Sequence, residues 1–145
     1  MKLISKSLRS SAPAAVILIR LMTGGVFLAE GIKKFLFAEQ WGSGRLARIG
    51  IPIPAFTGPF VGAVEVICGV LLIVGLLTRL GAIGLLIDIL VAIATTKIPI
   101  LIHRGFWAME DPARTDFCML LSLIFLLIAG GGAWSLDRKL SHKSG

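Results

Sequence analysis

Charged residues and residues that bind metals are scarce in this chain. Asp, Glu, Lys and Arg together make up 16% of the sequence, and it holds two His and two Cys. Cys68 and Cys118 form no CxxC motif; we expect small buried hydrophobic side chains, with a redox pair as the alternative. His103 and His142 lie at the end of an apolar run and in the C-terminal tail, where they cannot ligate a haem or iron centre inside a span. The sequence thus shows no metal site and no redox cofactor site.

Long apolar runs are what the sequence has instead. The hydrophobic fraction is 56% before the 17 glycines are counted, and four runs carry it, at about 14–36, 57–77, 80–102 and 115–134. Each run is close to the ~20 residues that cross a hydrocarbon core of ~30 Å as a helix. A soluble four-helix bundle would need charged outer faces, which these runs lack. We predict an all-α fold, one integral membrane bundle of four transmembrane helices spanning residues 1–145.

The positive charge is spread along the chain rather than gathered in one stripe. The formal net charge is +7, but Lys and Arg fall at the ends of the apolar runs, which argues against nucleic-acid binding. Counted by side, seven basic residues lie with the termini and seven on the opposite side, so the positive-inside rule decides little. We expect the N-terminal segment to be a retained first helix, because Arg20 interrupts its apolar run. Both termini are expected in the cytoplasm, with the protein in the cell (inner) membrane.

Ionisable residues in the runs share helix faces with small residues. Glu65 recurs with Gly58, Gly62 and Gly69 at helical spacing, and Asp88 does so with Gly81 and Gly84. Small residues let helices approach closely in lipid, and a charge in mid-membrane must point into the bundle and find a partner. We therefore expect Glu65 and Asp88 to face other helices.

Depth along the helices suggests the partners. At ~1.5 Å of rise per residue, Arg20 and Asp88 lie about 9 and 12 Å from the side of the termini, so we predict a buried Arg20–Asp88 ion pair. Glu65 lies deeper, within reach of Lys97, and Glu30 and Lys34 stand four residues apart on one helix. We predict that Glu65, Glu30, Lys34 and Lys97 line a pocket for a small polar or quinone-like ligand. The alternative is that these residues are ion pairs that only stabilise the bundle.

Several motifs resemble those of the DoxX family of small membrane proteins. Residues 50–86, GIPIPAFTGPFVGAVEVICGVLLIVGLLTRLGAIGLL, resemble its GxPxP loop followed by Glu, Gly, Leu-Leu and Thr-Arg. RLMTGGVFLAEGIKKF resembles its first helix, with Arg20, Gly24, Gly31 and Lys34 at the matching positions. HRGFWAMED and the closing GGGAWSLD resemble later motifs. Glu30 stands where such proteins often have His, and Asp88 is not part of the pattern.

The resemblance implies both a fold and a role. It implies four transmembrane helices and, for named members, a subunit of a terminal quinol oxidase or a thiosulfate:quinone oxidoreductase. We therefore expect a quinone-associated or anchoring subunit of a membrane oxidoreductase system, with quinone as the ligand and the redox centres on other membrane or redox subunits. A small-solute or proton transporter and a non-enzymatic scaffold are the alternatives, and a homo-oligomer is left open.

Overall fold

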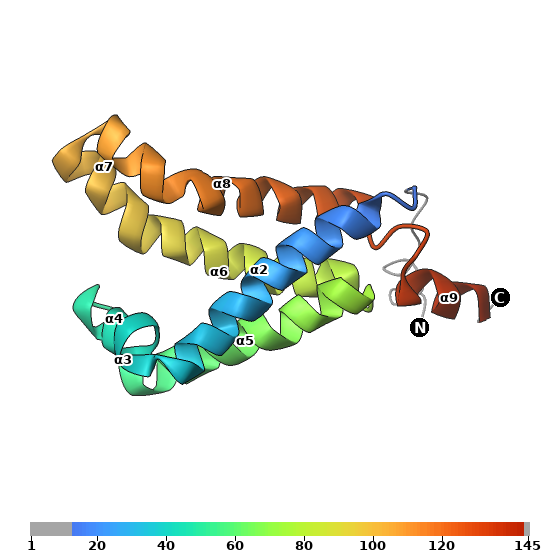
Figure 1. Cartoon of the computed structure of the whole chain (residues 1–145), viewed down its shortest axis with the longest axis horizontal. Coiled ribbons are helices and arrows are strands. Elements are labelled where there is room, and N and C mark those ends of the chain that lie inside the picture. Colours follow the sequence, from blue (N-terminus) through green and yellow to red (C-terminus); the bar gives the residue numbers. More distant parts are fainter. Residues whose placement is uncertain (1–12, 144–145) are drawn as a thin grey trace.

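The computed structural model describes residues 13–143, which form helices and turns and no β-strand. The all-α prediction is confirmed. Two long helices, α2 (Val16–Leu36) and α5 (Pro54–Val74), are connected through the short α3 (Ala38–Trp41) and α4 (Ser43–Arg48). Next, α6 (Thr78–Ala92) continues through the π-helical turn η1 (Ile93–Lys97) into α7 (Ile98–Arg104). The antiparallel α8 (Phe106–Ala129) returns, and α9 (Leu136–Lys143) ends the described chain (Figure 1).

Three helices are long and apolar enough to cross a membrane. They are α5, the continuous helix Thr78–Arg104 and α8, at 21, 27 and 24 residues. The first helix, α2, has 21 residues as well, but it carries four charged side chains. The composition of the described helices therefore supports three of the four predicted spans, and α2 has to be argued from its contacts.

Glycine and proline set helix ends that the apolar runs placed a few residues away. Pro54 opens α5 in its first turn, and Gly75 ends it with φ of 71°, a conformation that costs other residues energy. Only residues 75–77 separate α5 from α6, so the two helices form a tight hairpin. The last long helix, α8, ends at Ala129 rather than at 134, because Gly130 and Gly132 take positive φ. It begins at Phe106 rather than at 115, so the charged residues 110–114, which precede the apolar run, are helical.

Close glycine contacts join α2 to α5. A Cβ on Gly24 would lie 2.7 Å from the Gly69 carbonyl oxygen, and one on Gly31 would lie 2.8 Å from that of Gly62. The buried residues of α5 are Gly58, Gly62, Glu65, Gly69 and Leu72, which includes the whole predicted face. The two helices therefore pack backbone to backbone along most of their length.

The long helices form two pairs that diverge from one end. In Figure 1, α2 with α5 and α6 with α8 lie close at the end that carries α9 and residue 13, which we call the terminal end. They are farther apart at the other end, which carries α3, α4 and α7 and which we call the cavity end. Fully buried Leu72, Leu85, Leu123 and Leu126 fill the core toward the terminal end.

Arg20 closes the terminal end without the predicted acidic partner. Its guanidinium donates to the carbonyl oxygens of four residues at 2.6–2.9 Å: Leu72, Ile73, Gly131 and Trp134. The predicted ion pair with Asp88 is wrong, because these acceptors hold Arg20 at the end of α5, and Asp88 points to the other half of the bundle. Equal depth along two helices does not place side chains on facing sides.

Asp137 completes this closure. Its carboxylate accepts hydrogen bonds from the backbone N–H groups of Leu77 at 2.6 Å and Thr78 at 3.0 Å. Its own N–H donates to the Gly75 carbonyl oxygen. The last loop is thereby fixed against the α5–α6 turn, and the first turn of α6 gains a cap.

Candidate functional site

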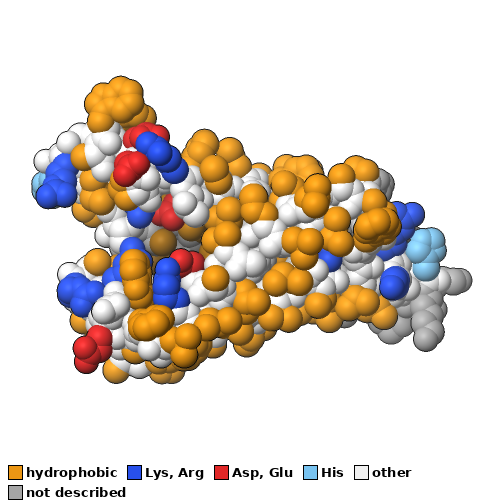
Figure 2. All heavy atoms as spheres, in the orientation of Figure 1, with side chains coloured by type: hydrophobic (Ala, Val, Ile, Leu, Met, Phe, Trp, Pro, Cys, Tyr) orange, Lys and Arg blue, Asp and Glu red, His pale blue; other side chains and the backbone are white. Residues whose placement is uncertain are grey.

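The cavity end of the bundle is hollow. Two adjoining chambers, of about 370 and about 150 Å³, share Lys34, Glu65 and Asp88 in their linings. The larger extends between α2 and α8 to Phe27 and Met119, and the smaller extends beneath α4. Figure 2 shows the hollow between the two helix pairs, with acidic and basic side chains around its mouth. All four long helices therefore contribute to one polar cavity.

Glu65 and Lys34 form the deepest ion pair. Lys34 Nζ donates to Glu65 Oε2 at 2.6 Å, and the two side chains are 12% and 5% exposed. Helical side chains lean toward the N-terminus of their own helix. Since α2 and α5 are antiparallel, Lys34 leans toward the membrane centre and Glu65 leans toward the cavity end, so the two side chains converge. This buried charge pair links α2 to α5.

Asp88 adds a second carboxyl group to the pair. It comes from α6 and lines both chambers together with Glu65 and Lys34. Two carboxyl groups and one ammonium group therefore face the same cavity. A carboxyl group there can take up or release a proton, and the ammonium can donate a hydrogen bond to a bound molecule.

Lys97 forms a separate ion pair across the same cavity. Its Nζ lies 3.2 Å from Asp116 Oδ2 of α8. Lys97 ends the π-helical turn η1, which precedes Pro99, a residue with no N–H to offer the carbonyl of Thr95. The Thr95 and Thr96 hydroxyls donate to backbone oxygens of the preceding turn. The helix is thus locally widened where it lines the cavity.

The mouth carries an aromatic ring between two cations. Lys33 Nζ lies 4.3 Å from the centre of the Trp41 ring, and the Arg45 guanidinium lies 5.7 Å from it. Lys33 also pairs with Glu30 of the same helix. Trp41, Lys33 and Arg45 all line the larger chamber. A ligand entering from this end therefore meets basic and aromatic side chains before it reaches the two carboxyl groups.

The structure brings the four predicted pocket residues, Glu65, Glu30, Lys34 and Lys97, around the larger chamber. Two of the expected contacts are different: Lys34 pairs with Glu65 rather than with Glu30, and Lys97 pairs with Asp116 rather than with Glu65. Whether these residues bind a ligand stays a prediction. Cys68 and Cys118 are not bonded to each other.

Asp116, Trp41 and Arg45 also line the cavity, and the sequence had not indicated them. A signal existed for Asp116, which stands at the start of the last apolar run. Trp41 and Arg45 belong to short helices between two spans, where no periodic pattern shows which way a side chain points. Asp88 was placed in the bundle, as it is, but with the wrong partner.

Helices of membrane-spanning length around a buried charged cavity define a helical membrane protein with an internal polar site. Comparison with known proteins gives its family. The DoxX family profile matches residues 15–98, and the chain belongs to the DoxX family.

Two relatives cover nearly the whole chain. The "Uncharacterized membrane protein Rv3486" of Mycobacterium tuberculosis (strain ATCC 25618 / H37Rv) is 50% identical over 143 residues, covering 94% of this chain and 88% of the relative. The "Putative oxidoreductase CatD" of Bacillus subtilis (strain 168) is 29% identical over 131 residues, covering 90% of each. No solved structure matches the chain significantly.

Proposed function

We propose that the cavity binds the headgroup of a quinone or quinol and that the protein is a quinone-associated subunit of a membrane oxidoreductase system. The observation that carries this proposal is the buried Lys34–Glu65 ion pair, with Asp88 in the same lining, in a chamber of about 370 Å³. Its walls include Val26, Phe27 and Met119, so a flat apolar ring finds both packing surface and polar groups.

The chemistry of the cavity suits this ligand. A quinol that is oxidised to a quinone gives up two electrons and two protons. A carboxylate of Glu65 or Asp88 would accept one proton from a ring hydroxyl, and the other would pass to water at the mouth of the cavity. The Lys34 ammonium can donate a hydrogen bond to a quinone carbonyl oxygen. The electrons would pass to a redox centre on a partner subunit, and the name of the Bacillus subtilis relative supports a link to oxidoreductases.

The membrane arrangement belongs to the same proposal. We take α2 as a fourth span, because its charges are neutralised or bonded within the bundle: Arg20 by carbonyl oxygens, Lys34 by Glu65 and Lys33 by Glu30. Its 21 residues are long enough to cross the hydrocarbon core. Four spans place both termini on one side, which we assign to the cytoplasm of the inner membrane.

A proton or small-solute pathway is the second candidate. Ionisable groups from α2, α5, η1 and α8 follow one another around the cavity, as a proton path requires. However, the terminal half is filled by fully buried leucines and closed by Arg20. Conduction would need a second conformation, whereas a binding site does not. A scaffold role would leave the carboxyl groups of the cavity without a purpose.

Quinone binding to a Trp41 reporter tests the proposal. A short-tailed quinone should quench Trp41 fluorescence in a Trp107→Phe/Trp134→Phe background, because Trp41 lines both chambers. Asp88→Asn should weaken binding at least tenfold, which is about 1.4 kcal/mol, with little change in melting temperature. Asp111→Asn is the control, because Asp111 is 77% exposed and outside the cavity lining.

Two results would decide against quinone. If Asp88→Asn and Asp111→Asn bind the quinone with equal affinity, the Asp88 carboxyl group does not contribute to quinone binding. Failure of the unsubstituted protein to bind any quinone, together with proton-coupled uptake in proteoliposomes, would favour the pathway instead.

A further inference from the structure

The two ends of the bundle differ sharply in net charge. Seven of the eight acidic residues lie in the half that holds the cavity, where seven basic residues balance them. Among the described residues, the terminal end has one acidic residue, Asp137, and five basic residues: Arg20, Arg79, Arg138, Lys139 and Lys143. Basic residues therefore outnumber acidic ones by four in the described part of this end, whereas the two signs balance at the cavity end.

The one acidic residue at the terminal end does not offset this charge at the surface. Asp137 is 2% exposed, and its two carboxylate oxygens accept the Leu77 and Thr78 N–H groups. Residues 1–12 lie outside the described part of the chain, and their sequence contains three basic residues and no acidic one. On the face drawn in Figure 2, acidic side chains appear at the cavity end and not at the terminal end.

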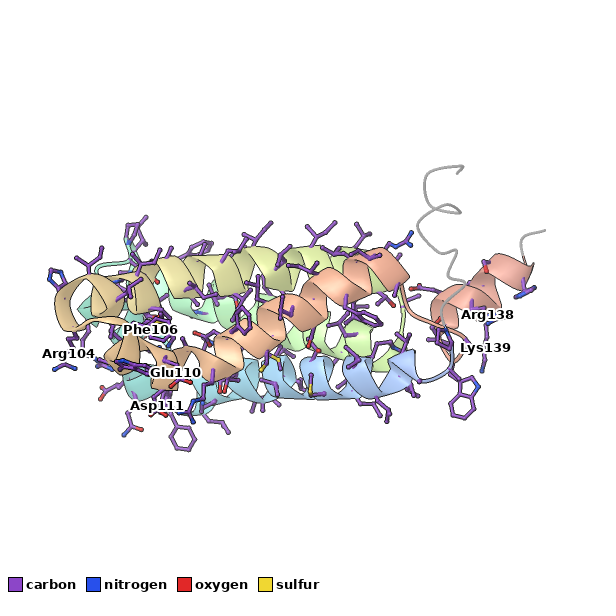
Figure 3. All side chains as sticks on the ribbon, turned by 90° about the horizontal axis from the view of Figure 1, so that it is seen from above. Arg104, Phe106, Glu110, Asp111, Arg138 and Lys139 are labelled. Carbon is purple, nitrogen blue, oxygen red and sulfur yellow. The ribbon has the colours of Figure 1, made fainter. Side chains whose placement is uncertain are left out.

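A groove at the terminal end has one basic residue, Lys139, in its lining. It has a volume of about 220 Å³ and is lined by Val74, Ala133, Trp134, Ser135, Leu136 and Lys139. Trp134 is 67% exposed and follows the end of α8, where an indole ring would sit at the level of the lipid headgroups. Arg138 and Lys139 follow on α9, which Figure 3 shows beyond the ends of the long helices.

We propose that this groove binds an anionic phospholipid. The lipid phosphate would lie against the Lys139 ammonium and the Arg138 guanidinium, and the upper acyl chain would pack on Val74 and the Trp134 ring. Asp137 fixes the first turn of α9 to the α5–α6 hairpin, so the two basic residues are held at the headgroup level. Anionic lipid rather than zwitterionic lipid is the partner, because the face carries positive charge with no exposed acidic residue to bind a choline or ethanolamine group.

The lipid site stands apart from the cavity and from the proposed quinone function. None of its lining residues lines either chamber of the cavity. Each basic residue near an anionic membrane surface contributes roughly a fivefold preference for it. Two such residues predict a clear preference that salt weakens.

Quenching of Trp134 by brominated lipids tests the proposal. The variant Trp41→Phe/Trp107→Phe leaves Trp134 as the sole tryptophan, and it is reconstituted with a fixed mole fraction of brominated phosphatidylglycerol or brominated phosphatidylcholine. Brominated phosphatidylglycerol should quench Trp134 more strongly. In the added variant Arg138→Gln/Lys139→Gln, the two lipids should quench equally. Lipid in both leaflets makes the result independent of the protein's orientation.

Matched reporters define the outcomes that overturn the proposal. In Trp41→Phe/Trp134→Phe, the remaining Trp107 at the cavity end should be quenched equally by both lipids. The site would be refuted if both brominated lipids quenched Trp134 equally when Arg138 and Lys139 are present. It would also be refuted if the stronger quenching by phosphatidylglycerol survived Arg138→Gln/Lys139→Gln. Free glycerol phosphate should not relieve the quenching. Relief at a low concentration would show that the groove recognises the phosphate alone, which contradicts the acyl-chain packing on Val74 and Trp134 proposed here.

Discussion

The side chain of Arg20 holds three segments of the chain together. Its guanidinium contacts carbonyl oxygens at the end of α5 and in the loop after α8, while its backbone belongs to α2. Each acceptor is a backbone group that lipid cannot satisfy. Arginine suits this position because its planar guanidinium carries five N–H donors, enough for the four carbonyl oxygens, whereas a lysine ammonium carries three.

We expect Arg20→Gln to destabilise the protein by about 3 kcal/mol or more, because several buried acceptors lose charged donors. Arg48→Gln is a matched control, since Arg48 also donates to two backbone carbonyls but in an exposed setting, and it should cost less than about 1 kcal/mol. Thermal unfolding in detergent measures both. Equal melting temperatures for Arg20→Gln and the unsubstituted protein would show that these hydrogen bonds do not hold the terminal end.

The Lys34–Glu65 pair should behave as a coupled unit. Glu65→Gln removes the hydrogen-bonded partner of the buried Lys34 ammonium, and Lys34→Met removes that of the buried Glu65 carboxylate. Each change alone should therefore be more destabilising than the two together. A double-mutant cycle on melting should give a coupling of about 1–3 kcal/mol. The Glu30–Lys33 pair, which is more exposed than Lys34 and Glu65, is the control and should couple by less than about 1 kcal/mol. Additive effects at Lys34 and Glu65 would contradict the buried pair.

Single residues were predicted from the sequence unevenly. That Glu65 lies on the packing face followed from its spacing with glycines, and the structure confirms it. The partner of Arg20 could not be predicted, because its acceptors are backbone carbonyls, which every residue has and no sequence pattern marks. Asp137 was noted only as the end of a family motif. Its capping role depends on a glycine loop that folds back over the α5–α6 turn.

At the scale of helices, the α2–α5 contact offers a direct test. Gly24→Ala would place a methyl group 2.7 Å from a backbone oxygen of α5, while the neighbouring Gly25 has open space at its Cβ position. We expect Gly24→Ala to lower stability by about 1–3 kcal/mol. Gly25→Ala should be neutral or slightly stabilising because alanine favours the helix. If detergent melting is equal for the two variants, the helices do not approach as closely as described.

Helix ends were the least predictable part of the fold. Apolar content sets where lipid can surround a helix, whereas glycine, proline and capping groups set where the helix stops. In α8, Arg114 pairs with Glu110 and Asp111, so this charged stretch stays helical beyond the apolar run. The predicted run began only at residue 115, so this stretch lay outside the predicted span. The sequence also does not decide whether α2 spans the membrane. The helix is long enough, but its charged side chains need partners that only the folded structure shows.

For the whole molecule, the proposed topology predicts which positions are open to each side of the membrane. In a Cys68→Ala/Cys118→Ala background, a cysteine at position 111 should react with an impermeant maleimide in intact cells. One at position 142 should react only after lysis. Residue 111 lies near the start of α8 at the cavity end, whereas residue 142 lies on α9 at the terminal end, which the proposal places in the cytoplasm. The reverse pattern would invert the orientation and keep the spans. Labelling of both positions in intact cells would mean an even number of crossings between them, so that α8 would not span the membrane once as proposed.

The bonding of Arg20 also has a consequence for the order in which the chain is made. Ribosomal synthesis delivers the first helix early, but two of its acceptors, the carbonyls of Gly131 and Trp134, are translated more than a hundred residues later. Until then the nascent first helix carries a cation that is only partly satisfied by the hairpin of residues 72 and 73. We therefore expect a chain truncated before residue 131 to leave the Arg20 guanidinium with two of its four acceptors, and its first helix to be held less firmly in the bundle.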